Sequence, residues 1–286
     1  MGGSLLVVRG GVEATAAGKW LMDSAKRACG LGGARLAATV LLVRDGPGGV
    51  EVWVQERVST MEHYPGMTVF PGGGVDERDW PQDFGSLWSG PSIVATARAL
   101  GTSRHKAHAL VFAAVRELFE ETGTLLAIDA TGATVEDASP FHGDRLALES
   151  HRLALTQVLQ RGQLRVRSDL LRPWARWVGP SERGTWFDTF SFLAVRPRGQ
   201  EPDGQTPEAL SAGWFPPGLI LQAWRHGLVR LVVSTWHQLL LLERCATVDE
   251  ALARAAVADM TPVILPATGD DPRFDDYYRN HPTDRR

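Results

Sequence analysis

The sequence predicts an α/β sandwich in which an acidic, amphipathic helix packs on a mixed β-sheet. Patterns of buried strands occur at 35–44, 50–57, 173–178, 186–195 and 210–215. Between the two groups of strands, residues 103–123 repeat apolar side chains at the spacing of a helix that covers a core. Strands flanked by helices in this order are typical of one sheet between helical layers.

Bulk properties narrow the class of protein. The 286 residues can bury a full core, and 44% hydrophobic and 22% charged residues are ordinary for a globular chain. A net charge of −3 without a basic run argues against nucleic acid or an anionic membrane as partner. The only cysteines are Cys29 and Cys245, which fits a reducing compartment. No apolar run is long enough to span a membrane. We therefore expect a cytoplasmic enzyme, and the sequence leaves a homodimer open.

The chain divides into four parts. Residues 1–33 are rich in Gly and Ala, with a short helix predicted from Lys19 to Cys29, and residues 34–217 carry the strands and the acidic helix of the main domain. Residues 218–268 predict a helical extension, with helices at 219–227, 234–244 and 248–257. The charged tail, 269–286, is expected to be loose.

The acidic helix ends in the stretch V-R-E-L-F-E-E-T-G, where Ser103 is the predicted N-cap and Gly123 the predicted stop. Glu117, Glu120 and Glu121 stand at i, i+3 and i+4, so their carboxylates share one face of the helix. Three like charges repel one another there. A divalent cation such as Mg²⁺ or Mn²⁺ would convert that repulsion into binding, because hard ions prefer carboxylate oxygen.

Upstream of this helix lies a glycine loop, F-P-G-G-G-V-D, that follows a predicted strand. Gly72, Gly73 and Gly74 lack side chains, so the backbone at these positions can come close to a phosphate. A metal-binding helix that faces such a loop suits a diphosphate, and the three glycines are candidate substrate-binding residues.

Together the two stretches resemble the Nudix box, a glycine, five residues, Glu, seven residues and R-E-U-x-E-E-x-G-U, with U aliphatic. The second half matches R-E-L-F-E-E-T-G, with Thr124 at the final aliphatic position. Gly73 falls on the box glycine and Asp79 on the box Glu. Between Asp79 and Arg116 lie 36 residues where the family usually has seven, so we expect 80–102 to be a surface excursion inserted into the box.

The resemblance implies a Nudix-type α/β/α sandwich and metal-dependent hydrolysis of a nucleoside diphosphate linked to another group. By position in the box, Mg²⁺ or Mn²⁺ would be bound by Glu117, Glu120, Glu121 and the backbone carbonyl of Gly73. Arg116 would hold and orient a carboxylate of the cluster. Family members often recruit a general base from a distant loop, and Glu208 is our candidate, with Glu182 and Asp188 as weaker ones.

A second resemblance concerns the substrate. From Val52 to Asp76 the sequence looks like the signature of coenzyme A diphosphatases, and Arg57, Ser59 and Gly66 fit it. The later stretches W-A-R-W-V and F-D-T-F-S-F-L resemble the larger acyl-CoA diphosphatases. This implies cleavage of CoA or acyl-CoA into adenosine 3′,5′-bisphosphate and (acyl-)4′-phosphopantetheine, with Arg57 in contact with phosphate, the 3′-phosphate above all.

Two alternatives stay open on the sequence alone. One is a Nudix hydrolase of ADP-ribose, a dinucleotide or a nucleoside triphosphate. The other is a Nudix-fold module that binds a nucleotide without catalysis, against which the intact set of three glutamates counts, since a binding module need not keep a metal cluster.

Overall fold

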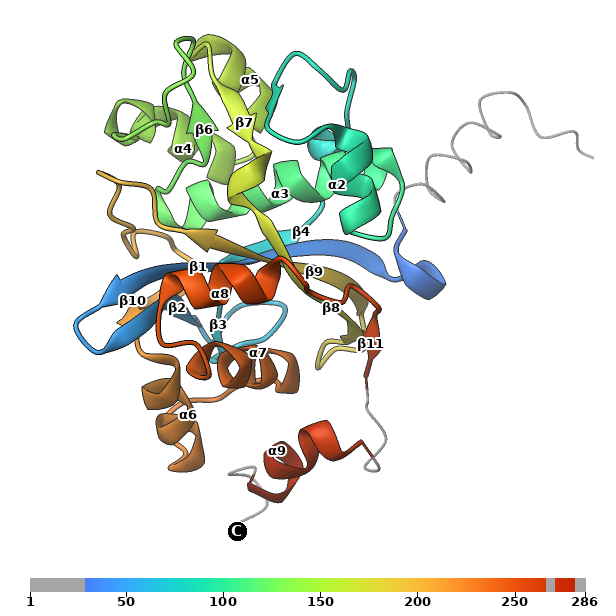
Figure 1. Cartoon of the computed structure of the whole chain (residues 1–286), viewed down its shortest axis with the longest axis vertical. Coiled ribbons are helices and arrows are strands. Elements are labelled where there is room, and N and C mark those ends of the chain that lie inside the picture. Colours follow the sequence, from blue (N-terminus) through green and yellow to red (C-terminus); the bar gives the residue numbers. More distant parts are fainter. Residues whose placement is uncertain (1–28, 266–270, 281–286) are drawn as a thin grey trace, which may run out of the picture.

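The computed structural model describes residues 29–265 and 271–280. These residues form three layers, with a mixed sheet between two groups of helices, and this confirms the predicted α/β/α sandwich (Figure 1). The helix predicted from Lys19 to Cys29 lies outside the described residues, except for its last residue, which forms an isolated bridge with Arg35. Within the described ranges, no helix is both long and apolar enough to cross a bilayer.

Eight strands of the described chain form the central sheet: β1 (Arg35–Gly46), β2 (Gly49–Arg57), β3 (Thr68–Val69), β4 (Gly72–Gly74), β8 (Arg172–Pro180), β9 (Trp186–Val195), β10 (Ala209–Phe215) and β11 (Val263–Ile264). Their order is β10-β2-β1-β9-β8-β11, with β3 beside β2 and β4 beside β1. The sheet is mixed because β1 runs parallel to β9 and antiparallel to β2 and β4.

The helices lie on both faces of this sheet (Figure 1). One side holds α2 (Ile93–Ala99), α3 (Arg104–Thr122), α4 (His142–Glu149) and α5 (Leu155–Arg161), together with a small sheet of β5 (Trp88–Ser89), β7 (Arg165–Arg167) and β6 (Ala127–Ile128). The other side holds α6 (Pro217–Arg225), α7 (Val233–Glu243), α8 (Val248–Ala255) and α9 (Asp275–Asn280).

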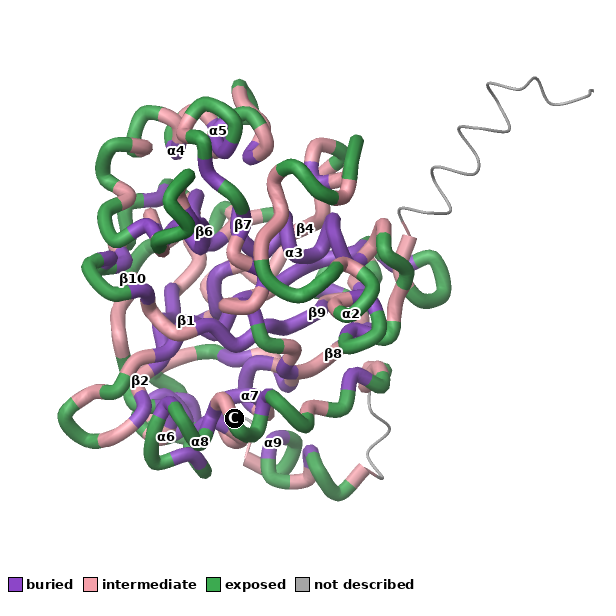
Figure 2. The backbone as a smooth tube through the Cα atoms, turned by 45° about the horizontal axis from the view of Figure 1, so that its top comes forward, coloured by how far each residue is buried: buried purple, intermediate pink, exposed green. Residues whose placement is uncertain are grey.

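The alternation of β1 side chains between the two faces of the sheet explains why helices cover both faces. Its even-numbered apolar side chains, Leu36, Ala38, Val40 and Leu42, pack in one core with α3, whereas Leu41 and Val43 belong to a second core with α6, α7 and α8. Successive side chains of a strand point to opposite faces, so a strand that is apolar throughout needs cover on both. Figure 2 shows β1 buried over most of its length at the centre of the molecule.

Helix α3 begins and ends where the sequence predicts. The Ser103 hydroxyl accepts a hydrogen bond from the Lys106 amide at 3.3 Å, and Gly123 adopts φ 73°, which favours glycine as a helix stop. The helix is buried over almost its whole length, because the central sheet lies on one side and α2, α4 and the small sheet lie around the rest.

The segment 80–102 contributes more to the core than a surface excursion would. Ser92 caps α2, and Ala97 and Leu100 are buried in the same core as α3. β5 pairs in parallel with β7 and so extends the small sheet. Regularly spaced apolar residues are few in this segment, which is why its sequence predicted a loop or small helix.

The tail predicted to be loose is not loose over the described residues 271–280. There η5 (Pro272–Phe274) leads into α9, and Phe274 and Tyr277 are buried among aromatic side chains of β8, α6 and α7. Two aromatic residues in a charged stretch are a weak signal, and their partners lie far away in the sequence. The helices of 218–268 likewise form one whole layer of the sandwich, with Trp224 and Trp236 in its core.

Candidate active site

The glycine loop reaches the acidic end of α3 because β4 pairs with the first half of β1. The Gly72 amide donates a hydrogen bond to the Glu121 carboxylate at 2.9 Å. A Cβ atom on Gly73 would lie 2.4 Å from Glu117 Oε1, so a larger residue would displace that carboxylate. Glycine at 73 therefore allows the loop to lie against the Glu117 carboxylate. This contact is the physical reason why the loop can face the carboxylate helix, as predicted.

Arg116 connects the two halves of the predicted box. Its side chain is 4% exposed and its guanidinium binds the Asp79 carboxylate through Nε and Nη2, at 3.0 and 2.9 Å. The other contacts reach Glu117 at 2.7 Å, Glu120 at 3.4 Å and the carbonyl oxygen of Gly74 at 2.9 Å. Burial opposes the charge on Arg116, yet the Glu117 and Asp79 carboxylates hold its pKa above the ordinary range.

The cluster carries more negative charge than its arginines balance. Burial, followed by the Glu117 charge, raises the pKa of Glu120 to about 8, and its Oε1 atom is buried without a hydrogen-bond partner. Burial and then the charges of Glu117 and Glu208 raise the pKa of Glu121 well above its usual range. Arg116 lies 3.4 Å from Glu120 and Arg57 lies 3.8 Å from Glu121, yet both pKa values stay raised, and this is the electrostatic condition in which a bound cation stabilises a site.

Among the residues that the structure describes, no three His, Cys, Asp or Glu side chains already form a metal site. The carboxylates instead bind Arg116, Arg57 and the Gly72 amide. Their chemistry nevertheless fits Mg²⁺ or Mn²⁺, since these ions take carboxylate oxygens and one such oxygen of Glu120 is buried without a partner.

Glu208 and Arg57, far apart in the sequence, come together beside the cluster. β10 pairs with β2, which sets the Glu208 carbonyl against the Val58 amide at 2.9 Å. The Arg57 guanidinium then lies 3.2 Å from the Glu208 carboxylate and 3.8 Å from that of Glu121. Both predicted residues therefore stand at the acidic end of α3.

The two weaker candidates for a base differ in position. Asp188 is fully buried and its carboxylate is bound by Arg176 at 2.8 and 2.7 Å and by the Leu31 amide at 2.8 Å. Such an ion pair is structural. Glu182 instead lines the same cavity as Glu208 and accepts a hydrogen bond from the Tyr64 amide at 3.2 Å.

A cavity of about 650 Å³ opens from this cluster. Glu117, Glu208 and the glycine loop form part of its wall, and much of the remaining wall is apolar or aromatic, including Tyr64, Trp177, Phe187, Leu265 and Tyr278. Tyr278 comes from α9, in the segment predicted to be loose, and no sequence pattern indicated that it would contribute to the cavity. Phe274 and Tyr277, close to it in the chain, are buried and so hold Tyr278 beside the cavity.

No protein family model matches the sequence. Among solved structures, the NUDIX hydrolase from Alicyclobacillus acidocaldarius is 28% identical, with 82% of this chain and 100% of that one covered and a TM-score of 0.64. Two more distant matches are the NUDIX domain of NrtR from Shewanella oneidensis complexed with ADP ribose (15% identical, 84% and 98% covered, TM-score 0.39) and an Ap4A hydrolase from C. elegans (12% identical, 78% and 98% covered, TM-score 0.39).

The fold is similar to that of a NUDIX hydrolase, and together with the glycine loop and the carboxylate helix it defines a pyrophosphohydrolase, an enzyme that cleaves diphosphate bonds. This chain resembles the Alicyclobacillus hydrolase over that protein's whole length.

Proposed function

We propose that the protein hydrolyses the diphosphate bond of coenzyme A or acyl-coenzyme A. The observation that supports this choice is the cavity, in which the catalytic carboxylates adjoin a wall built largely from Tyr64, Trp177, Phe187 and Tyr278. Such a wall suits a leaving half that is long and largely apolar, as an acyl-phosphopantetheine is. It suits less well the polar second sugar of ADP-ribose or a dinucleotide.

In this proposal, Glu117, Glu120, Glu121 and the Gly73 carbonyl hold the divalent cation. When bound, the cation neutralises diphosphate oxygens and lowers the pKa of bound water. Arg116 fixes Glu117 and Glu120 through the contacts described above. Water attacks phosphorus, its proton passes to Glu208, and the bond to the bridging oxygen breaks. Arg57 holds Glu208 in place and faces the diphosphate oxygens.

The test is a panel of diphosphates, offered with Mg²⁺ and with Mn²⁺, with products identified by mass. We expect CoA and acyl-CoA to give adenosine 3′,5′-bisphosphate and (acyl-)4′-phosphopantetheine with the highest kcat/KM. Dephospho-CoA, ADP-ribose and a diadenosine polyphosphate serve as matched comparisons. Faster turnover of ADP-ribose than of every CoA species would contradict the assignment to CoA and leave the diphosphatase itself.

A further inference from the structure

The cavity beside the carboxylates forms where the side chains of the central sheet become small. On the face of the sheet toward α7, Leu41 of β1 and Leu193 of β9 fill the core. Nearer the glycine loop, the same two strands carry Ala37, Thr39 and Thr189 on that face, and these three line the cavity. The smaller side chains leave a slot between the sheet and α7.

The slot crosses four neighbouring strands, starting at the glycine loop. Gly74 of β4 pairs with Ala37 of β1, and Ala37 pairs with Thr189 of β9. On its other side, Thr189 pairs with Trp177 of β8. Neighbouring strands lie about 4.8 Å apart, so three such steps give the slot a length of about 14 Å. One end therefore adjoins the catalytic carboxylates, and the other end lies at β8.

Positive charge in this cavity is confined to the catalytic end. Of the lining residues that the structure describes, Arg57 is the only arginine or lysine, and it lies between Glu121 and Glu208. Beside β8 the lining residue with a charge is Glu182, which is exposed. A phosphate in the slot would have no guanidinium or ammonium partner there and would face a carboxylate.

The groups that a ligand can touch in the slot are hydroxyls and rings. Thr39, Thr189, Tyr64 and Phe187 are half-buried, and Tyr278 is 39% exposed. Each threonine hydroxyl can donate one hydrogen bond and accept others without carrying a charge. A chain of neutral amides matches these hydroxyls, and the methylene groups between its amides can pack on the rings.

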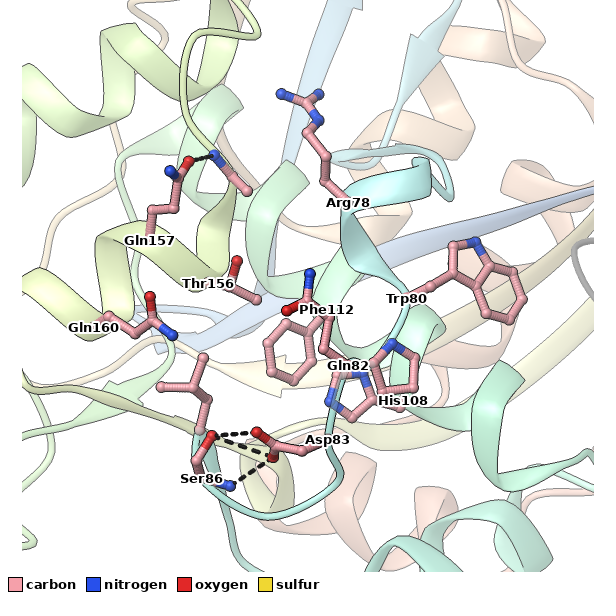
Figure 3. Close-up of a pocket in the computed structure, with 13 residues that line it drawn as sticks. Arg78, Trp80, Gln82, Asp83, Ser86, His108, Phe112, Thr156, Gln157 and Gln160 are labelled. Carbon is pink, nitrogen blue, oxygen red and sulfur yellow. Dashed lines mark hydrogen bonds between the residues drawn. The ribbon is translucent and has the colours of Figure 1, made fainter. Parts of the chain in front are cut away.

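The smaller pocket between α3, α5 and the segment after η2 (Glu77–Asp79), about 290 Å³ in volume, has a different kind of wall (Figure 3). There the His108 ring stacks on Phe112 with centroids 4.0 Å apart, and the two residues are 4% and 1% exposed. The rings cover each other, so this pocket offers a substrate chain no open aromatic surface.

We propose that the slot binds the pantetheine arm of the substrate as a neutral amide chain, with Thr39 and Thr189 as the residues that recognise its amides. The arm runs from the metal cluster across β1 and β9, and its sulfur end reaches Leu265, which lies against Gly179 of β8. The adenosine half, with its additional phosphate, lies outside the slot. The identity of the chain rests on the function proposed above.

Isothermal titration of the full-length, metal-free protein with pantetheine tests the slot without any turnover. We expect saturable binding, and weaker binding of an alkanediol of similar length, which lacks the amides. Thr39→Val and Thr189→Val should each weaken pantetheine binding by about fivefold, because valine has a similar shape but loses a hydrogen bond. Thr156→Val on α5 is the control, a half-buried threonine outside the slot, and should bind as the wild type does.

Competition with adenosine 3′,5′-bisphosphate identifies which half of the substrate the slot holds. We expect this nucleotide to leave the affinity for pantetheine unchanged. Absence of saturable pantetheine binding, unchanged binding in both slot variants, or displacement of pantetheine by the nucleotide would overturn the inference.

The titration and the panel of diphosphates can fail separately. If ADP-ribose is cleaved faster than every CoA species while pantetheine still binds through the two threonines, the proposed function is wrong and the slot remains a site for a neutral amide chain. If CoA is cleaved best but both slot variants bind pantetheine as the wild type does, the inference alone is wrong.

Discussion

At the scale of single residues, the cluster depends most on Arg116. Its planar guanidinium meets Asp79 with two nitrogens and still reaches Glu117, Glu120 and the Gly74 carbonyl, which a lysine ammonium could not do from one position. The partner Asp79 is 1% exposed, so the pair is buried on both sides. Loss of either partner would leave an uncompensated buried charge, which is strongly destabilising.

Glu121→Gln should lower kcat/KM by about 10²-fold or more, the scale seen when a charge-stabilising group is removed. Its carboxylate is buried among like charges, so the uncharged amide should keep the fold and raise the melting temperature of the metal-free protein. Glu243→Gln, at the exposed end of α7, is the control. A Glu121→Gln enzyme with activity near that of the control would remove this residue from the metal site.

Arg57→Ala should slow every diphosphate substrate to a similar degree. The sequence pointed to the 3′-phosphate of CoA as its target, but the side chain lies between Glu208 and Glu121 at the catalytic end of the cavity. We therefore expect kcat/KM to fall to a similar degree for CoA and for dephospho-CoA. The ratio of the two kcat/KM values should then be the same in the variant as in the wild type. A large change in that ratio would show that Arg57 reads the 3′-phosphate after all.

At the scale of elements, α2 shows how a segment with a weak apolar pattern becomes part of a core. Leu100→Ala should lower the free energy of unfolding by about 2–5 kcal/mol, because this fully buried side chain packs in the core of α3. Val94→Ala, on the exposed side of the same helix, should change it far less. Urea unfolding of both variants measures the difference. Equal changes in the free energy of unfolding would mean that the segment 80–102 contributes no more to stability than a surface loop.

The helices α6 to α9 cover one face of the sheet, and residues of α7 and α9 also line the cavity of the candidate active site. α9 adds Tyr278 to the cavity wall and is held by Tyr277, whose hydroxyl donates to the Leu231 carbonyl at 3.0 Å and whose ring stacks on Trp224. The end of the described chain thus adjoins the catalytic cavity.

At the scale of the whole molecule, two buried histidines make a contribution to stability that decreases as the pH drops below neutrality, opposite in sign to the contribution of Glu120, whose pKa is raised. Burial lowers the pKa of both His108 and His237 from 6.5 to about 4. Between these values the two histidines bind protons in the unfolded chain but not in the folded chain, so their contribution to the free energy of unfolding decreases as the pH falls from about 6.5 to about 4. Each histidine contributes a slope of at most about 1.4 kcal/mol per pH unit.

His237→Leu isolates one of these contributions, because the ring packs against Trp177 and Phe274 and leucine can fill the same space. As the pH falls from 6.5 to about 4, we expect the unfolding free energy of the wild type to decrease relative to that of the variant, measured by urea unfolding of both proteins. An unchanged slope would show that this histidine does not resist protonation in the folded protein.

Sequence patterns predicted the local parts of this protein because each depends on neighbours in the chain. β1 carries apolar side chains on both faces between Leu36 and Val43 and must be covered on both, and Ser103 and Gly123 bound α3 by capping chemistry alone. Likewise, the spacing of Glu117, Glu120 and Glu121 sets them on one helix face whatever the rest of the chain does. The layered fold and the centre of the candidate site followed from these local rules.

Only the tertiary structure decided what depends on partners distant in the sequence. Strand pairing between β2 and β10 brings Glu208 to Arg57, and pairing between β8 and β9 brings Asp188 to Arg176. The burial of α9 and of Leu100, and the pocket that α5 shares with α3, arise where segments with weak patterns of their own meet a surface already formed. Whether these residues are buried depends on both surfaces that pack together. The sequence pattern of one segment describes only one of those two surfaces.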